Sequence, residues 1–254
     1  MRLALFETPG DGGPRLGAAV SAGIVPVDLM PGVDGAVALR ETIARFSELR
    51  VEIESAVAAR APIPLDQVVL LPPVASPSKL LCVLRRLGPS PDHPVDLQVF
   101  LRARGAALGS GGEIVLPELD GADLFTQNAC LGVVIGGPTR SLAAADWREA
   151  VFGYTGMIDI APRTQARVRW KGGPGPMSPI GSSCDSFAPL GPWIVPRAEV
   201  DDREGLRLRL RCGTELRQDE RLEDLDHWVG AAIERASSVM TLRPGDIVAI
   251  DGSL

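Results

Sequence analysis

Leu124–Gly137 reads LFTQNACLGVVIGG, and the interpretation of the whole chain starts from this stretch. Its second half, Cys130–Gly136, is an apolar run rich in valine and isoleucine that ends on paired glycines, which is typical of a buried β-strand. Asn128 and Cys130 stand where the strand would carry its chemistry. Because residues two apart on a strand point to the same face, we expect both side chains to face one cavity. The stretch therefore predicts a buried strand that offers an amide and a thiol.

Composition excludes several classes of protein. The chain has 254 residues, 45% of them hydrophobic and 23% charged, which suits one substantial globular domain with a smaller one attached. A net charge of −6 argues against nucleic acid as a partner. The apolar run at the start, MRLALFETPGDGG, is too short for a signal peptide. No other apolar run is long enough to span a membrane. We expect a cytoplasmic protein whose four widely spaced cysteines are reduced.

The flanking segments predict a small module followed by a larger one. Residues 1–70 contain short strand-like pieces and then an amphipathic pattern over Ala36–Ala59, which favours one or two helices. A proline-rich boundary precedes the apolar run Lys79–Leu84, which predicts the first strand of the main domain. Later patterns predict a short helix over Ala143–Val151, a hairpin over Leu206–Asp219 and a helix over Leu225–Met240.

Three stretches carry a family resemblance: LFTQNACLGVVIGG, GYTGMIDIAPRT at Gly153–Thr164 and DSFAPLGPWIVP at Asp185–Pro196. Together they resemble the fumarylacetoacetate hydrolase family. The resemblance implies an α+β, mainly β fold. Its mixed β-roll main domain would span 78–254, shortened at its C-terminus, beside a small N-terminal α+β module at 1–70. Family members act on diketo or oxo acids as hydrolases, decarboxylases, isomerases or hydratases, and they use a cation to stabilise an enolate.

The chain departs from this family where the chemistry lies. The family's Glu-x-Glu is Asn128-Ala129-Cys130 here, whereas the third metal carboxylate is retained as Asp159, with Arg163 beside it. The family's lysine is absent from Gly181-Ser182-Ser183-Cys184-Asp185. One carboxylate of three cannot hold a magnesium-type cation, since a hard dication requires several anionic oxygens. We therefore predict a divergent member that has no metal and no other cofactor.

Two further positions have both a functional and a plain interpretation. Arg102 stands where the family commonly has lysine, and its planar fork would suit a substrate carboxylate, although an exposed arginine is usually only solvated. His93 lies in Arg85–Pro94, where three prolines and a glycine replace a helical lid. It is either a loop histidine or a general base. A nucleophilic serine in the loop at 181–185 would need a histidine, and the chain has only His93 and His227.

These observations give one set of candidate residues and three hypotheses. The candidates are Asp159, Cys130 and Asn128 for catalysis, and Arg102, Arg163, Ser182, Ser183, Arg85 and His93 for substrate binding. The first hypothesis is a metal-independent lyase, isomerase, cyclase or hydrolase of a small oxo or dicarbonyl acid, with Asp159 as general base. The second is a non-catalytic scaffold or partner subunit, as a homodimer or as a heteromer with a related chain. The third keeps a softer metal on Cys130 and Asp159.

Overall fold

The computed structural model describes residues 1–10, 12–86, 96–118, 124–163, 183–200, 206–222 and 224–251. The strands are β1 (Leu3–Glu7), β2 (Arg15–Val20), β3 (Gly23–Pro26), β4 (Val69–Leu70), β5 (Leu80–Arg86), β6 (Asp96–Arg102), β7 (Ala107–Leu108), β8 (Leu124–Ile135), β9 (Val151–Arg163), β10 (Ala188–Pro196), β11 (Arg207–Cys212), β12 (Glu215–Arg221) and β13 (Ile247–Asp251). The α-helices are α1 (Gly35–Ala44), α2 (Phe46–Ala59), α3 (Trp147–Ala150) and α4 (Leu225–Val239).

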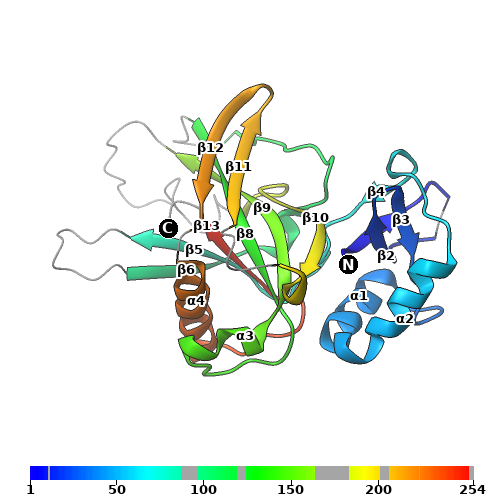
Figure 1. Cartoon of the computed structure of the whole chain (residues 1–254). Coiled ribbons are helices and arrows are strands. Elements are labelled where there is room, and N and C mark those ends of the chain that lie inside the picture. Colours follow the sequence, from blue (N-terminus) through cyan, green and yellow to red (C-terminus); the bar gives the residue numbers. More distant parts are fainter. Residues whose placement is uncertain are drawn as a thin grey trace.

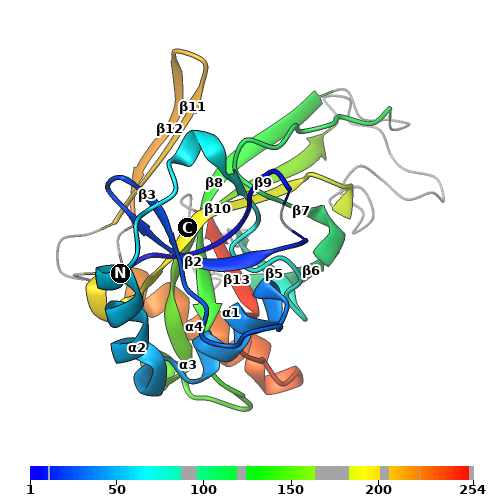
Figure 2. The same ribbon diagram turned by 90° about the vertical axis from the view of Figure 1, so that its right-hand side faces the viewer.

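One mixed sheet runs through the described part of the chain. Its eleven strands include the path β3-β2-β1-β10-β9-β8-β13-β5-β6, with β4 beside β1 and β7 beside β10. A separate hairpin, β11–β12, projects away from α3 and α4 (Figures 1 and 2). At the centre, β13 runs parallel to β5 and antiparallel to β8. The central strands thus belong to segments far apart in the sequence.

Strand β8 is longer than its apolar pattern predicts. It begins at Leu124 rather than at Cys130, because the residues from Leu124 to Val134 pair with β9 in continuous antiparallel register. The first five residues are half-buried and the last seven are buried. Hydrogen bonds to β9, rather than a run of apolar side chains, therefore keep the polar half of this strand extended.

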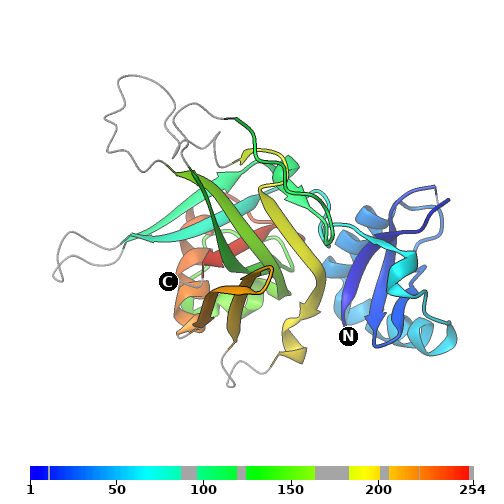
Figure 3. The same cartoon turned by 90° about the horizontal axis from the view of Figure 1, so that it is seen from above.

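The N-terminal module packs closely on the main sheet. The predicted helical segment forms two helices, and Asp34 caps the first by accepting a hydrogen bond from the backbone N of Ala36 at 2.9 Å. Leu3 of β1 pairs with Ile194 of β10, so the sheet passes from the module into the main domain. Seen from above, the module lies beside β10 (Figure 3). The division of the chain between 70 and 78 stays a prediction.

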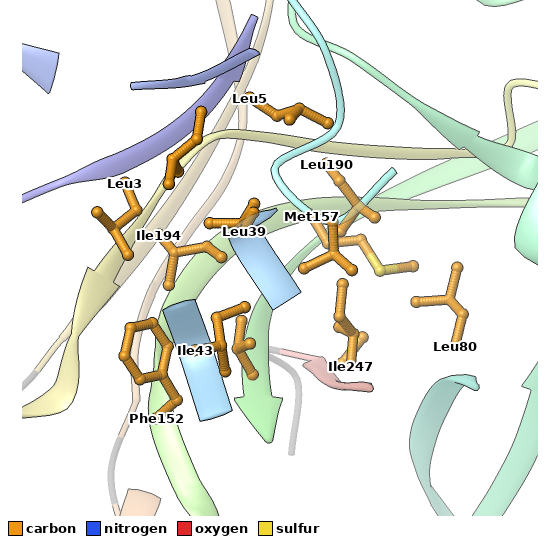
Figure 4. Close-up of a cluster of buried hydrophobic side chains, with 14 of the residues drawn as sticks. Leu3, Leu5, Leu39, Ile43, Leu80, Phe152, Met157, Leu190, Ile194 and Ile247 are labelled. Atoms are coloured by element: carbon orange, nitrogen blue, oxygen red, sulfur yellow. The ribbon is translucent and has the colours of Figure 1, made fainter. Parts of the chain in front are cut away.

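A shared apolar core joins the module to the main sheet (Figure 4). The side chains labelled there come from β1, α1 and four strands of the main domain, β5, β9, β10 and β13. They are Leu3, Leu5, Leu39, Ile43, Leu80, Phe152, Met157, Leu190, Ile194 and Ile247. Burying one such side chain contributes roughly 1.5–3 kcal/mol. Separating the two parts would therefore expose a substantial area of core.

A second core covers the opposite face of the central strands. There α4 packs its buried side against residues of β5, β8 and β13, together with Trp147 of α3. Trp147 is only 2% exposed and belongs to this core. Within the described segments, no helix has the length and apolar character that crossing a bilayer requires. The polar side chains of the central strands gather on the face that α4 does not cover.

A buried carboxylate ties β5 to the turn before β13. Asp246 is fully buried, and its Oδ1 accepts hydrogen bonds from the Ser78 hydroxyl at 2.6 Å and the Lys79 backbone N at 2.7 Å. Its Oδ2 accepts one from the backbone N of Arg243 at 2.8 Å and lies 3.3 Å from Nζ of Lys79. These bonds fix the start of the two parallel strands that form the centre of the sheet.

Asp246→Ala should therefore destabilise the protein strongly. The change leaves buried donors without an acceptor, and we expect a loss of about 3–5 kcal/mol in the free energy of unfolding by urea titration. Asp246→Asn keeps the shape and one acceptor oxygen, so its loss should be smaller. A loss below about 1 kcal/mol for Asp246→Ala would contradict the role assigned to this carboxylate.

Candidate active site

The register of the central strands gathers polar residues on one face. Asn128 of β8 lies directly opposite Asp159 of β9, and Cys130 lies directly opposite Asp251 of β13. Residues directly opposite one another in an antiparallel pair point to the same face. The central strands therefore have one face, opposite to the one that α4 covers, that carries Asn128, Cys130, Asp159 and Asp251. We call it the inner face.

Arg102 joins this group from the far edge of the sheet. It ends β6, and β5, β13 and β8 lie between β6 and β9 in the sheet. Four strand spacings of about 4.8 Å would put β6 roughly 19 Å from β9 in a flat sheet. Nη2 of Arg102 nevertheless forms an ion pair with Oδ1 of Asp159. The sheet must therefore curl so that its two walls face each other across the interior.

The guanidinium of Arg102 is held on several sides. Its side chain is 1% exposed, its Nε donates to Sγ of Cys82 at 3.3 Å, and its Cζ lies 5.4 Å from the ring centroid of Phe100. Nη1 is buried and has no hydrogen-bond partner among the described residues. The interpretation of Arg102 as an ordinary solvated arginine is wrong. The N–H bonds of Nη1 therefore remain for a ligand to satisfy.

Two residues of this cluster, Asp251 and Cys82, are not among the site residues that the sequence predicts. Asp251 is 4% exposed, and its Oδ2 accepts a hydrogen bond from Nδ2 of Asn128 at 3.1 Å. An acidic residue directly after the apolar run Ile247–Ile250 is the signal that could have identified it. Cys82 donates its thiol proton to Oδ1 of Asp159 at 3.7 Å. It lies within the apolar run Leu80–Leu84, where no pattern marks it as part of a site.

Burial sets the protonation of these groups. The pKa of Asp159 is raised by burial and by the nearby charge of Asp251, whereas Arg102 opposes the shift. Burial also raises the thiol pKa values of Cys82 and Cys130, with further increases from Asp159 beside Cys82 and from Asp251 beside Cys130. Both thiols are therefore protonated at neutral pH and are poor nucleophiles or metal ligands.

These donors do not fit a magnesium-type cation. Asn128 turns its amide N–H toward Asp251, Cys130 offers a protonated thiol, and Asp159 is held by a guanidinium. A hard dication needs several anionic oxygens, and the positive charge of Arg102 would repel it. Among the residues described, no three His, Cys, Asp or Glu side chains are grouped so that they could hold a metal. Binding of a softer metal through Cys130 and Asp159 stays a prediction.

The remaining predicted residues are only partly placed. Ser183 is half-buried, and its Oγ accepts a hydrogen bond from the backbone N of Ala103 at 3.2 Å, next to Arg102. The backbones of Arg85 and Arg163 belong to β5 and β9. The side chains of Arg85 and Arg163, and the whole of Ser182 and His93, lie outside the described residues.

A cavity of about 510 Å³ adjoins the cluster. The turn Gly109–Gly112, strands β8, β9 and β10, and the hairpin strand β11 line it, and Cys130 belongs to both the lining and the cluster. The hairpin is fixed here because Gln218 of β12 accepts from the backbone N of Ala129 at 2.6 Å and donates to its carbonyl at 3.3 Å. The volume suits a small organic acid.

Comparisons with known proteins bear on both fold and site. The family model described as fumarylacetoacetate (FAA) hydrolase, C-terminal, matches residues 81–250. The crystal structure of maleylpyruvate hydrolase from Sphingobium sp. SYK-6, in complex with manganese(II) ion and pyruvate, has a TM-score of 0.81 and 31% identity, and covers 99% of this chain and 89% of that one. This similarity confirms the predicted α+β, mainly β fold.

Named sequence relatives are similar over most of the chain. A mitochondrial oxaloacetate tautomerase of Bos taurus, FAHD2B, is 30% identical over 264 residues, which cover 98% of this chain and 79% of the relative. A maleylpyruvate hydrolase of Aquipseudomonas alcaligenes is 29% identical over 236 residues, which cover 86% of this chain and 76% of the relative. Both relatives are named for activity on oxo acids.

The four cysteines should differ in their reaction with a thiol reagent. Cys212 is exposed, whereas Cys82 and Cys130 are buried with raised pKa values. With dithionitrobenzoate at pH 8, we expect Cys212 to react fast and Cys82 and Cys130 to react only after unfolding. Cys212→Ser should remove the fast phase. Fast labelling of Cys130 in the folded protein, located by peptide mass spectrometry, would contradict a protonated, enclosed thiol.

Removing the guanidinium should cost stability in a pH-dependent way. In Arg102→Met, Asp159 loses the cation that lowers its pKa, so its folded pKa rises further above the unfolded value of about 3.9. The folded state then holds the proton more tightly, so stability is retained below about pH 4 and lost as pH rises through the folded pKa. At pH 8 we expect a loss of about 3–5 kcal/mol in urea unfolding.

Two further variants control this measurement. Arg102→Met combined with Asp159→Asn removes both charges and should regain much of the stability at pH 8. Arg148→Met breaks an exposed ion pair with Asp226 and should change stability little at any pH. A loss in Arg102→Met that does not depend on pH would show that the pair is not what stabilises this site.

Proposed function

The chain belongs to the fumarylacetoacetate hydrolase family, and we propose that it is an enzyme that acts on a small oxo or dicarbonyl acid through an enolate, without a divalent metal. The observation that carries the proposal is the buried pair of Arg102 and Asp159 on the inner face of the sheet. It supplies a base and a positive charge within one enclosed site. The similarity to an oxaloacetate tautomerase and to maleylpyruvate hydrolases supports the substrate class.

Asp159 is the proposed general base. Its carboxylate takes a proton from the carbon next to the oxo group, the C–H electron pair becomes the enolate double bond, and the negative charge moves onto the oxo oxygen. The proton then returns to another carbon or to the enolate oxygen. Because burial raises the pKa of Asp159, its carboxylate is a stronger base than an exposed aspartate would be.

Independence of a metal rests on the donor set. The related maleylpyruvate hydrolase is described with manganese(II) and pyruvate, so a cation and an oxo acid occur together in that protein. In this chain the corresponding positions hold Asn128, Cys130 and an Asp159 that is already paired. The negative charge that develops on the substrate must therefore be offset by the protein's own groups, in a site where low polarity strengthens that interaction.

A second candidate function is a non-catalytic scaffold or partner subunit. One observation favours it: Asp159 is 6% exposed, and the described cavity meets the cluster at Cys130 rather than at Asp159. A carboxylate that no substrate reaches would be purely structural. Pairing as a homodimer or as a heteromer with a related chain stays a prediction. Turnover of any oxo acid that depends on Asp159 separates the two candidates.

The enzyme hypothesis predicts turnover that chelation does not affect. With oxaloacetate, acetylpyruvate and maleylpyruvate as substrates, we expect at least one to react, with kcat unchanged within about twofold in excess EDTA. Asp159→Asn should lower kcat by about 10²–10⁴-fold, because the base is lost. Activity should rise with pH through the folded pKa of Asp159, since only the ionised carboxylate accepts a proton.

Asp226→Asn serves as the matched control because this exposed aspartate of α4 lies in an ion pair outside the site. It should leave kcat unchanged. Activity that disappears in EDTA and returns with Mn²⁺ would refute metal independence. No turnover of any of the three acids would favour the scaffold.

A further inference from the structure

We propose that the guanidinium of Arg102 replaces the divalent cation of the family, as a fixed positive charge whose Nη1 binds the substrate's oxo oxygen. The substrate part of this inference rests on the proposed function, whereas the replacement of the cation does not. In cation-dependent relatives the resemblance places three carboxylates at the positions of Asn128, Cys130 and Asp159. Here the arginine side chain reaches the last of these from the opposite wall.

The geometry puts the charge where a cation would have to be. Asn128 and Asp159 lie directly opposite each other, and Cys130 is the next inward-facing residue of β8. A cation shared by these three positions would contact Oδ1 or Oδ2 of Asp159 from the interior. Nη2 of Arg102 makes that contact with Oδ1. The arginine and a metal therefore compete for one carboxylate.

The surroundings of Arg102 hold it in this position. Cys82 accepts from Nε, and Phe100 faces the guanidinium, so the side chain is fixed independently of Asp159. A buried donor without a partner is uncommon, because leaving an N–H group unsatisfied costs free energy. Nη1 is such a donor among the residues described. An oxo or carboxylate oxygen of a small acid would satisfy it.

The replacement also limits the reaction class. A guanidinium polarises an oxygen through its N–H groups, as a metal does through its charge. It cannot lower the pKa of a bound water to produce hydroxide, because it has no coordination position for water. The site therefore suits proton transfer through an enolate, such as tautomerisation or isomerisation, rather than hydrolysis by a metal-bound water.

Manganese binding tests the replacement without reference to activity. Isothermal titration with Mn²⁺ would compare the wild type, the variant Asn128→Glu with Cys130→Glu, and the same variant with Arg102→Met added. We expect no stoichiometric site in the wild type and a site in the triple variant, with a rise in its melting temperature on adding Mn²⁺. The double variant, which keeps Arg102, should bind at least about tenfold more weakly than the triple variant.

Two outcomes of the titration would overturn the proposal. One is a stoichiometric Mn²⁺ site in the wild type that Asp159→Asn abolishes. The other is equal affinity in the double and triple variants, because Arg102 would then lie outside the cation's place. If the triple variant does not fold even with Mn²⁺, the proposal is tested by the binding of oxalate instead.

Oxalate, a planar mimic of an enolate of an oxo acid, tests the role of Nη1. In EDTA, wild type should bind oxalate, and Arg102→Gln should bind it about 10–100-fold more weakly, the range of one charge-assisted hydrogen bond. Arg102→Lys keeps the positive charge and should lose less. Circular dichroism establishes whether each variant folds. If Arg102→Gln does not fold, the oxalate affinities of the wild type and Arg102→Lys are compared instead.

The oxalate result also separates this inference from the proposed function. Unchanged oxalate binding in the folded arginine variants would overturn the role of Nη1, even if an oxo acid is turned over. Oxalate binding that depends on Arg102, together with no turnover of any oxo acid, would support the replacement of the cation by Arg102 but refute the enzyme hypothesis and, with it, the substrate part of the inference.

Discussion

The ion pair between Arg102 and Asp159 is the contact on which the arrangement of the site depends. It joins β6 to β9, which three strands separate along the sheet, so it can form only if the sheet curls. Both side chains are almost completely buried, and neither charge would be tolerated there alone, because a buried unpaired ion costs several kcal/mol. The curl of the sheet and the pairing of the charges therefore support each other.

The two faces of the central strands divide structural and chemical roles between them. The face under α4 is mainly apolar and packs as a conventional core. On the other face, apolar residues shared with the N-terminal module form the other core, which includes Cys82 and Cys130 of the polar cluster. Asp246 fixes the start of β5 and β13, and Gln218 fixes the hairpin on β8. The charged groups are thus held by strands that cannot easily shift.

Local patterns predict most of the fold, whereas the site depends on contacts that no local pattern carries. The helices over Ala36–Ala59 and α4, and the hairpin β11–β12, follow from periodicity and turn residues. The extension of β8 to Leu124 does not, because it comes from pairing with β9. Asp159 and Arg102 are identified singly by the resemblance, but their pairing needs the curled sheet. Asp251 joins them only because β13 lies beside β8.

Charge balance explains why several positions differ from the family together. Three carboxylates around a dication leave one net negative charge. Here the cluster holds one guanidinium, which pairs with Asp159, and a second carboxylate, Asp251, which Asn128 binds, so the formal charges again sum to one negative charge. Glutamates at 128 and 130 beside a singly charged arginine would leave two more buried negative charges uncompensated, which would lower the stability of the metal-free protein. A neutral Asn128 and a protonated Cys130 are therefore what a site built around Arg102 requires, and Asp251 supplies the second carboxylate that keeps the balance.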